Sequence, residues 1–440
     1  MSLLLKNAVI VTMNDRLEVV NGDVSIREGR IAAVGSVPDA PHDRVIDAEG
    51  DYVLPGLIQT HIHLCQTLFR GYADDMPLMQ WLRTRVWPME AAHSPATLRA
   101  AARLATTELL SSGTTAVLTM ETVHDTDVVF EAVAESGMRA TIGKCMMDAD
   151  ADVPSRLKER TQTSLDESLA LRARWHGQAN GRIHAALAPR FAVSCTRDLL
   201  ESVAALSREH QSLVHTHASE SREEIAIVRE LSGGLSNLAY LDSLHLATPH
   251  LCAAHCVWAD ESEQQMLAAR DVKVMHCPGS NLKLGSGIAP VVEMRQKGIT
   301  VSLGADGAAC NNRLDMFEEM RLAALLQSMR LAPGALTARD VLWMATRSGA
   351  RTLGLEDEIG SVEPGKKADL VRVRRRDVHL APDIDPYSTL VYAARGSDVL
   401  TTIVDGVVLV DHGEPVRVSR AEIAHEAGLA AGVLAERAGV

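Results

Sequence analysis

Eight short apolar stretches run through the central part of this 440-residue chain, and amphipathic segments such as 97–111 and 315–330 separate them. The amphipathic segments have the periodicity of helices. Strands that alternate with helices form a parallel sheet, and eight such units close into a (β/α)8 barrel. The sequence therefore predicts an α/β fold with a TIM-like barrel. The predicted strands span residues 53–63, 114–120, 139–147, 182–189, 212–218, 250–257, 272–277 and 300–305.

Short β segments with turn signals occur at both ends of the chain. Asn21-Gly22 lies between apolar runs near the N-terminus, and Asp405-Gly406 lies between two such runs near the C-terminus. These dipeptides are typical of β-hairpins. We expect both ends to build one small β-sandwich domain beside the barrel. The expected boundaries are 1–53 and 362–440 for its two parts, the second including a terminal helix, and 54–361 for the barrel.

The composition favours a globular chain that acts on a small molecule. The formal net charge is −13 and no run of lysine and arginine occurs, which argues against nucleic acid or a membrane surface as a partner. No stretch has the length of an apolar membrane span, and the N-terminus lacks the pattern of a signal peptide. Seven scattered cysteines fit reduced thiols better than a disulfide framework, so we expect a cytoplasmic protein.

The predicted strands end on polar side chains, which are costly to bury without partners. In a (β/α)8 barrel, the C-terminal ends of the strands carry the active site. The first strand ends on His61 and His63, which are two positions apart and therefore point to the same side. By themselves, two such histidines are more often hydrogen-bonded core residues than ligands. The later strands end on Arg190, His217, His255, His276 and Asp306.

Four of these residues form a candidate set of metal ligands. His61, His63, His217 and Asp306 offer three imidazoles and one carboxylate, and a closed barrel brings the ends of strands one, five and eight together. These ligand types suit Zn²⁺, and they also suit Fe²⁺ or Mn²⁺. The fourth strand, RIHAALAP, has no lysine that would bridge a second metal. We therefore predict a mononuclear site.

Neighbouring residues offer the proton transfers that hydrolysis requires. Glu220 lies three positions after His217 and is predicted to be the general acid, the alternative being a carboxylate that stabilises a helix N-terminus. His255 is expected to orient the water or the developing oxyanion, and Asp306 to accept a proton from the water. His276 either lines the pocket or is a structural histidine.

The remaining histidines and cysteines receive no role. We assign His215 to the opposite face of its strand from His217 and expect it to point outward against the helices. Cys252 and Cys256 do not form a Cys-x-x-Cys pair, and the His-x-Glu and Pro-Cys-x-x-Cys signature of a different zinc deaminase fold is missing.

The chain resembles the amidohydrolase superfamily, and within it the branch of purine and s-triazine aminohydrolases. The motifs that carry this resemblance are LPGLIQTHIHL, HTHASE, AAHCVW, HCPGSNLKLGSGIAP and SLGADGAACNNRLDMFEEMRLAALL, with IGSVEPGKKADLV in the small domain. The resemblance implies that the four ligands hold one zinc ion and that Glu220 and His255 are catalytic. It also implies hydrolytic removal of an amino group from an aromatic N-heterocycle.

Within that branch, SNLKLGSGIAP and DGAACNN most resemble deaminases of 5'-modified adenosines, such as 5'-methylthioadenosine, S-adenosylhomocysteine and 5'-deoxyadenosine. In those enzymes a glutamate that matches Glu90 holds the ribose hydroxyls. Lys144 and Arg156 match two cations that would neutralise a carboxylate on the 5' substituent, or they are ordinary surface charges. Arg190 lies in the segment APRF after the fourth strand, and this segment more closely resembles that of guanine deaminases and some 5'-deoxyadenosine deaminases. Arg190 either donates to a purine acceptor or anchors its loop by a salt bridge.

The segment after the first strand is a predicted lid that is rich in aromatic residues. Phe69, Tyr72, Trp81 and Trp87 fall within it. These side chains, Trp87 in particular, form either a wall for a flat base or a local core or dimer contact.

The sequence therefore predicts a mononuclear zinc-dependent hydrolytic deaminase of a 5'-modified adenosine, a purine nucleoside. The alternatives are a deaminase of guanine or another purine base, an s-triazine amino- or chlorohydrolase, and a barrel scaffold without catalysis. The resemblance also implies a homodimer or a higher homo-oligomer.

Overall fold

The central part of the chain is a nearly closed barrel of eight parallel strands, as predicted. The computed structural model describes residues 2–38, 41–149 and 153–440. The strands neighbour one another in chain order, and the first and last meet where Asp306 donates its backbone N–H to the carbonyl oxygen of His61 at 3.1 Å. The barrel strands are β6 (Leu57–Ile62), β7 (Thr114–Met120), β8 (Arg139–Met146), β9 (Ile183–Pro189), β10 (Val214–Ala218), β11 (Leu251–His255), β12 (Lys273–His276) and β13 (Val301–Leu303).

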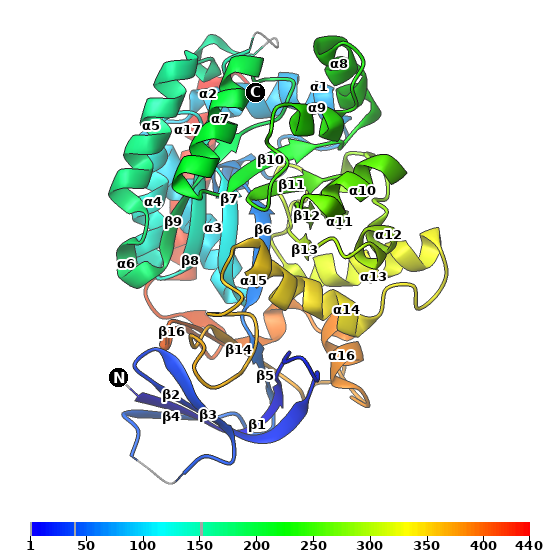
Figure 1. Ribbon diagram of the computed structural model, residues 1–440. Coiled ribbons are helices and arrows are strands. Elements are labelled where there is room, and N and C mark those ends of the chain that lie inside the picture. The colour runs from blue at the N-terminus through cyan, green and yellow to red at the C-terminus, as the bar shows by residue number, and fades with distance from the viewer. Residues whose placement is uncertain (1, 39–40, 150–152) are drawn as a thin grey trace.

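Helices cover the outside of the barrel (Figure 1). Val117 and Ile142 of the strands share a buried apolar cluster with Val129 and Phe130 of α4, which shows how a helix face and the sheet bury each other. The longer barrel helices are α3 (Pro95–Ser111), α4 (Thr126–Ser136), α5 (Thr161–Trp175), α7 (Arg197–His210), α8 (Arg222–Ser232), α10 (Glu261–Ala269) and α13 (Met316–Arg330). Shorter helices include α6 (Gln178–Gly181), α9 (Asn237–Ser243), α11 (Pro278–Lys283), α12 (Val291–Gln296), α14 (Ala338–Trp343), α15 (Gly349–Thr352) and α16 (Pro386–Ser388).

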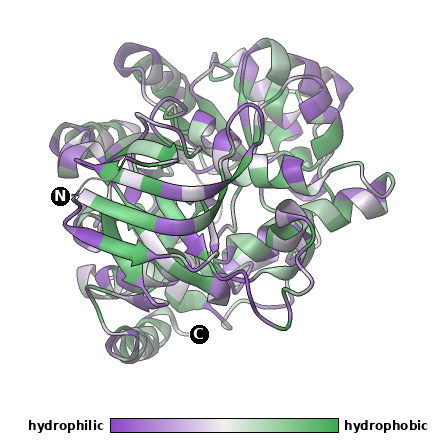
Figure 2. Ribbon diagram, turned by 90° about the horizontal axis from the view of Figure 1, so that it is seen from below, coloured by the Kyte–Doolittle hydropathy of each residue, from purple (hydrophilic) through white to green (hydrophobic). Residues whose placement is uncertain are grey.

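Both ends of the chain build the small β domain, as expected, and its strands form one nine-stranded mixed sheet. The two halves meet where β5 pairs with β1 on one side and with β14 on the other. Figure 2 looks onto this domain from below. Its strands are β1 (Ser2–Val11), β2 (Val19–Arg27), β3 (Arg30–Gly35), β4 (Arg44–Asp47), β5 (Tyr52–Pro55), β14 (Leu370–Val373), β15 (Val399–Val404), β16 (Val407–Asp411) and β17 (Glu414–Pro415).

The C-terminal helix α17 (Arg420–Ala438) leaves the small domain and packs against α3 and α2 of the barrel. A buried ion pair between Arg139 of β8 and Asp369, with nitrogen–oxygen distances of 2.7 and 3.0 Å, also joins the domains. None of the described helices is both long enough and apolar enough to cross a membrane.

The chain between β6 and α3 folds over the C-terminal end of the barrel, on the side away from the small domain (Figure 1). It contains η1 (Leu64–Phe69), α1 (Leu78–Trp81), η2 (Leu82–Val86) and α2 (Trp87–Ala92). We refer to residues 64–92 as the lid segment. Its position places it directly above the strand ends that carry the predicted ligands.

Candidate active site

The four predicted metal ligands converge at the C-terminal end of the barrel. Asp306 Oδ1 lies 3.3 Å from Nε2 of both His61 and His63, and Nε2 of His63 lies 3.3 Å from Nε2 of His217. One donor atom from each residue lies within 4.8 Å of the other three. The strands thus bring together residues that are up to 245 positions apart in the sequence, from 61 to 306.

Hydrogen bonds at the other ring nitrogens orient two of the histidines. His63 Nδ1 lies 2.7 Å from the carbonyl oxygen of Met120, and His217 Nδ1 lies 2.7 Å from that of Arg190. Because a carbonyl oxygen only accepts hydrogen bonds, each Nδ1 carries the proton and each Nε2 presents a lone pair. This is the usual support of a histidine that binds a metal.

His215 supports the third histidine from inside the barrel. Its Nε2 lies 2.6 Å from Nδ1 of His61, and its side chain is buried. The expectation that His215 points outward is therefore wrong. Residues two positions apart on a strand point to the same face, so His215 shares the inner face with His217.

The donor set fits a divalent metal ion. His61 Nε2 is buried, and no described residue forms a hydrogen bond with it. Burial lowers the pKa of His61 to about 4 and holds the pKa of His217 well below its usual value, so both imidazoles are neutral, as metal ligation requires. Burial alone would raise the pKa of Asp306, but His61 and His63 hold it well below its usual range. Neutral imidazoles with an ionised carboxylate suit zinc.

Glu220 and His255 lie beside the ligands. His255 Nε2 is 3.5 Å from Glu220 Oε2 and 3.8 Å from Asp306 Oδ2. Burial raises the pKa of Glu220 to about 7. Burial opposes the charged form of His255, but the carboxylates of Glu220 and Asp306 outweigh it and raise the pKa of His255. Both side chains can therefore hold a proton at neutral pH.

Three residues between β12 and α12, which the sequence analysis did not single out, fix these groups. Ser280 Oγ donates to Asp306 Oδ2 at 2.7 Å, and Ser286 Oγ donates to Glu220 Oε1 at 3.2 Å. Asn281 Oδ1 lies 2.8 Å from Nδ1 of His255. All three belong to the motif HCPGSNLKLGSG, which was the available signal, although it does not tell which partner each residue contacts.

Glu224 fixes the backbone that carries Glu220. Its Oε2 accepts the backbone N–H of Glu220 at 2.7 Å, and Asn237 Nδ2 donates to Oε1. Glu224 also forms a capping box with Ser221 at the start of α8. The expected alternative for Glu220, a carboxylate at a helix N-terminus, thus describes Glu224, while Glu220 faces the ligands.

The backbone is strained where it carries the site. His255, Asp306 and Ser219 have φ angles of 71°, 64° and 52°. Such positive φ angles cost side-chain-bearing residues about 1–3 kcal/mol each and concentrate at functional sites. Gly304 is required for close packing, because a Cβ there would lie 2.5 Å from the carbonyl oxygen of His61.

Glu90 and Arg190 form a buried ion pair with each other. Arg190 Nη1 donates to Glu90 Oε2 at 2.5 Å and Nη2 donates to Oε1 at 3.3 Å, while Gln66 Nε2 donates to Oε1 at 2.9 Å. Of the two roles considered for Arg190, the salt bridge is the one present. Arg190 and Gln66 line the cavity beside the ligands, with Glu90 behind them.

The structure does not bring Lys144 or Arg156 to this cavity. Lys144 Nζ lies 2.6 and 2.7 Å from the two carboxylate oxygens of Glu159 and 3.6 Å from Glu167 of α5. Cys145, the next residue of β8, faces the barrel interior. Because successive residues of a strand point to opposite faces, Lys144 lies on the outer side. Arg156 is half-exposed, and its guanidinium lies 3.8 Å from Asp125.

The aromatic residues of the lid segment divide between the two expected roles. Trp87 and Phe69 are fully buried in the core, and Tyr72 is exposed. Trp81 lines the cavity, and its Nε1 has no hydrogen-bond partner among the described residues. The cavity measures only about 20 Å³. Its lining is His63, Gln66, Leu78, Trp81, Leu82, Arg190, Phe191, His217, Glu220, Leu284 and Asp306.

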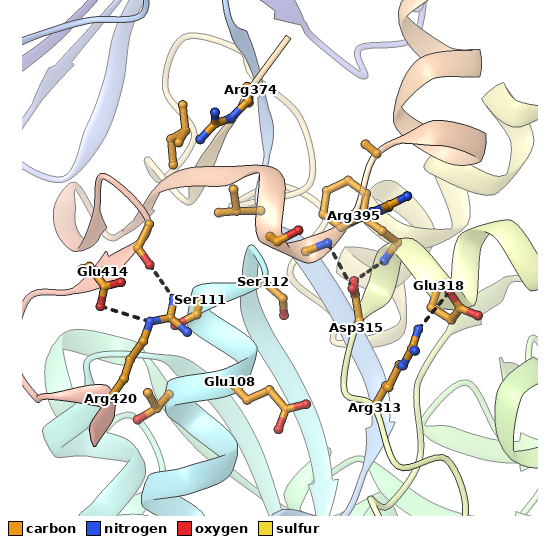
Figure 3. Close-up of a pocket in the computed structure, with 18 of the residues that line it drawn as sticks. Glu108, Ser111, Ser112, Arg313, Asp315, Glu318, Arg374, Arg395, Glu414 and Arg420 are labelled. Atoms are coloured by element: carbon orange, nitrogen blue, oxygen red, sulfur yellow. Dashed lines mark hydrogen bonds and ion pairs between the residues drawn. The ribbon is translucent and has the colours of Figure 1, made fainter. Parts of the chain in front are cut away.

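A much larger cleft of about 1290 Å³ lies elsewhere, among α3, α13, α17 and the small domain (Figure 3). Some of its charges form ion pairs: Arg420 Nε lies 3.2 Å from Glu414, and Arg313 lies 3.7 Å from Glu318. Asp315 accepts the backbone N–H of Gly396 at 3.0 Å. Within the described part of the chain, the lining of this cleft includes none of the predicted ligands or catalytic residues.

Comparisons with known proteins show which family the chain belongs to. The model of the amidohydrolase family matches residues 52–409. The chain is 43% identical to a 5'-deoxyadenosine deaminase of Methanothermobacter thermautotrophicus over 89% of this chain and 90% of that protein. It is 42% identical to a 5-methylthioadenosine/S-adenosylhomocysteine deaminase of Desulforudis audaxviator, over 93% of this chain and 94% of the other.

A solved structure shares the fold. The crystal structure of an adenosine deaminase from Xanthomonas campestris with bound zinc superposes with a TM-score of 0.92 at 32% sequence identity. The match covers 99% of this chain and 98% of that chain, so both the barrel and the small domain take part.

Proposed function

Because the chain belongs to the amidohydrolase family and is a hydrolase acting on C–N bonds, we propose that it is a mononuclear zinc-dependent deaminase of a 5'-modified adenosine. The substrate is of the 5'-deoxyadenosine, 5'-methylthioadenosine or S-adenosylhomocysteine type, and the products are ammonia and the inosine analogue. The observation that carries the proposal is the convergence of three histidines and Asp306 beside the Glu220–His255 pair. The names of the similar proteins support the substrate class.

In this proposal His61, His63, His217 and Asp306 hold the zinc ion. When bound, zinc would act as a Lewis acid and lower the pKa of a water molecule from about 15.7 to near 7. Asp306 also has a second oxygen, Oδ2, which Ser280 orients by a hydrogen bond of 2.7 Å. That oxygen would accept the proton of the attacking water.

Glu220 would act as the general acid towards a ring nitrogen of the adenine. Its pKa of about 7 leaves much of it protonated at neutral pH, as an acid catalyst must be. Ser286 donates to the carboxyl group of Glu220, and Glu224 accepts the backbone N–H of Glu220, so both the side chain and the backbone of Glu220 are held in place. His255, held by Asn281, would donate from Nε2 to the oxygen that gains negative charge.

The apolar side of the cavity would receive the purine. Leu78, Trp81 and Leu82 of the lid segment line it together with Phe191 and Leu284. A space of about 20 Å³ is far below the roughly 300–1,000 Å³ of ligand pockets, so side chains that line it would have to move before a nucleoside could enter. The unpaired indole N–H of Trp81 would then donate to a substrate acceptor.

A free purine base such as guanine is the second candidate substrate. The observation that favours it is the Glu90–Arg190 pair, because Glu90 is buried, accepts three hydrogen bonds from Arg190 and Gln66, and does not itself line the cavity. Arg190 and Gln66 would then contact the base directly.

The test is ammonia release from a panel of substrates by zinc-loaded enzyme. The panel comprises 5'-deoxyadenosine, 5'-methylthioadenosine, S-adenosylhomocysteine, adenosine, guanine and a triazine. Turnover of the modified adenosines supports the proposal, and turnover of guanine alone replaces it with the second candidate. Glu90→Gln separates the two further when both substrate types are assayed: a ribose-binding role predicts a much larger loss of kcat/KM on nucleosides than on free bases, whereas an equal loss on both would mean that Glu90 acts only by holding Arg190.

A further inference from the structure

Glu319 of α13 is a fully buried carboxylate that joins three separate segments. Its Oε2 accepts the backbone N–H of Gly279 in α11 at 3.0 Å. Its Oε1 accepts from Nδ2 of Asn311 at 2.7 Å, and the same Nδ2 donates to the carbonyl oxygen of Ala305 at 2.7 Å. The carboxylate therefore connects α13 to α11 and to the loop that follows β13.

Each of these segments carries part of the candidate active site. In α11, Ser280 donates to Asp306, and Asn281 contacts His255. In the loop after β13, Ala305 immediately precedes Asp306. The contacts of the carboxylate thus lie one or two residues from the partners of a predicted ligand and of a predicted catalytic histidine.

The contact between these segments is too close for a larger residue. A Cβ at Gly279 would lie 2.5 Å from Oε1 of Glu319 and 2.7 Å from Nδ2 of Asn311. Burial raises the pKa of Glu319, while the hydrogen bonds from Gly279 and Asn311 favour its ionised form. An apolar side chain would avoid the cost of burying a carboxylate but would leave the buried N–H of Gly279 without its acceptor, so the carboxylate serves these hydrogen bonds and not packing alone.

We propose that Glu319 is a positioning residue that holds Asp306 and His255 in their relative places by clamping α11 to the loop after β13. It touches neither the ligands nor the substrate and acts through Gly279 and Asn311. The proposal rests on the metal site of the proposed function, but it does not depend on which substrate the enzyme uses.

Glu319→Gln tests the clamp with little change in volume. Both oxygens of Glu319 accept from N–H donors, so the glutamine must place its own NH₂ group against one of them. We expect zinc affinity, measured by competition with a chromophoric chelator, to fall about 10–100-fold, and kcat to fall by a similar factor while KM changes little. Loss of outer hydrogen bonds to metal-site residues typically has effects of this size.

Glu318→Gln is the matched control. Glu318 is the preceding residue of α13, is partly exposed, and lies 3.7 Å from Arg313. This variant makes the same chemical change one position away and should keep the zinc affinity and kcat of the wild type. Glu319→Gln protein that is folded and equals Glu318→Gln in both quantities would overturn the proposal. A lower Tm with unchanged zinc affinity would likewise reduce Glu319 to a structural residue.

Gly279→Ala changes the other partner of the same contact, and it tests the proposal even if the Glu319→Gln protein does not fold. The added methyl group must displace the carboxylate, so we expect the same loss of zinc affinity. Combined in one chain, the two substitutions should give less than the sum of their separate effects, because they break the same contact. If the wild type deaminates no purine, the proposed function fails, but the zinc affinities of these variants still test the clamp.

Discussion

The rim of the barrel and the large cleft beside the small domain have opposite properties. The cleft is open and is lined by many charged side chains, some of which form ion pairs with one another. The rim has almost no free volume, yet it holds buried polar groups, strained φ angles and a buried His61 Nε2 that no described residue satisfies. A protein tolerates such costs only where the groups have another use.

This comparison shows that volume is a poor guide to chemistry in this molecule. The cleft in Figure 3 has the space for a ligand, but its lining includes none of the predicted ligands or catalytic residues. At the rim, Glu220 and His255 have pKa values shifted by burial and by neighbouring charges, which is the property expected of an active site.

Removal of the metal should give the largest effect that distinguishes the rim from the cleft. We expect dialysis against a chelator to abolish ammonia release, and added Zn²⁺ to restore it, because a metal-activated water is the nucleophile of the proposed reaction. Inductively coupled plasma mass spectrometry before and after dialysis follows the metal. Full activity in protein shown to be metal-free would contradict the claim that the rim is a metal-dependent active site.

Glu220→Gln should have the next largest effect. Loss of a general acid lowers kcat/KM by about 10²–10⁴-fold. Glu220 must be protonated to act, and its pKa is raised to about 7. The active fraction is therefore complete below that pH and decreases as the pH rises through about 7. A pH profile of kcat/KM should show this decline in the wild type, and the decline should be missing in the variant.

Glu159→Gln should affect stability but not catalysis. It leaves Lys144, which is buried on the outer side of β8, without its main partner. Breaking a buried ion pair costs about 3–5 kcal/mol, which urea unfolding would measure. Glu167→Gln, at the more distant and half-exposed partner, should cost less. A selective loss of activity on S-adenosylhomocysteine in Glu159→Gln would instead connect Lys144 to the substrate.

Arg420→Gln in the cleft should have the smallest effect. Its partner Glu414 is exposed, so the change in unfolding free energy should stay within about 0.5 kcal/mol. Steady-state kinetics should match the wild type. A clear change in kcat/KM would show that the cleft communicates with the rim and would remove the contrast between the two regions.

The sequence predicts the barrel and the convergence of the candidate ligands because both leave local signals. The barrel strands are buried on both faces and rich in apolar residues, and His61, His63, His217 and Asp306 lie at or near their C-terminal ends. Asp306 and the histidines could therefore be grouped by the one rule that strand ends meet at the rim.

The contacts between distant segments left no such signal. Arg190 and Glu90 were each considered as substrate ligands, but they are 100 positions apart and nothing in the sequence pairs them. The same holds for Glu319 and Gly279, which are 40 positions apart. The misplacement of His215 was of another kind, because strand alternation alone was sufficient to assign its face correctly.

The most direct test of the central claim is the metal content of purified protein and of its His217→Ala variant. The proposed site predicts about one zinc per chain in the wild type and a large loss of zinc in the variant, with the fold retained by circular dichroism. Two metals per chain, or a variant that keeps its zinc, would contradict a single site built from His61, His63, His217 and Asp306.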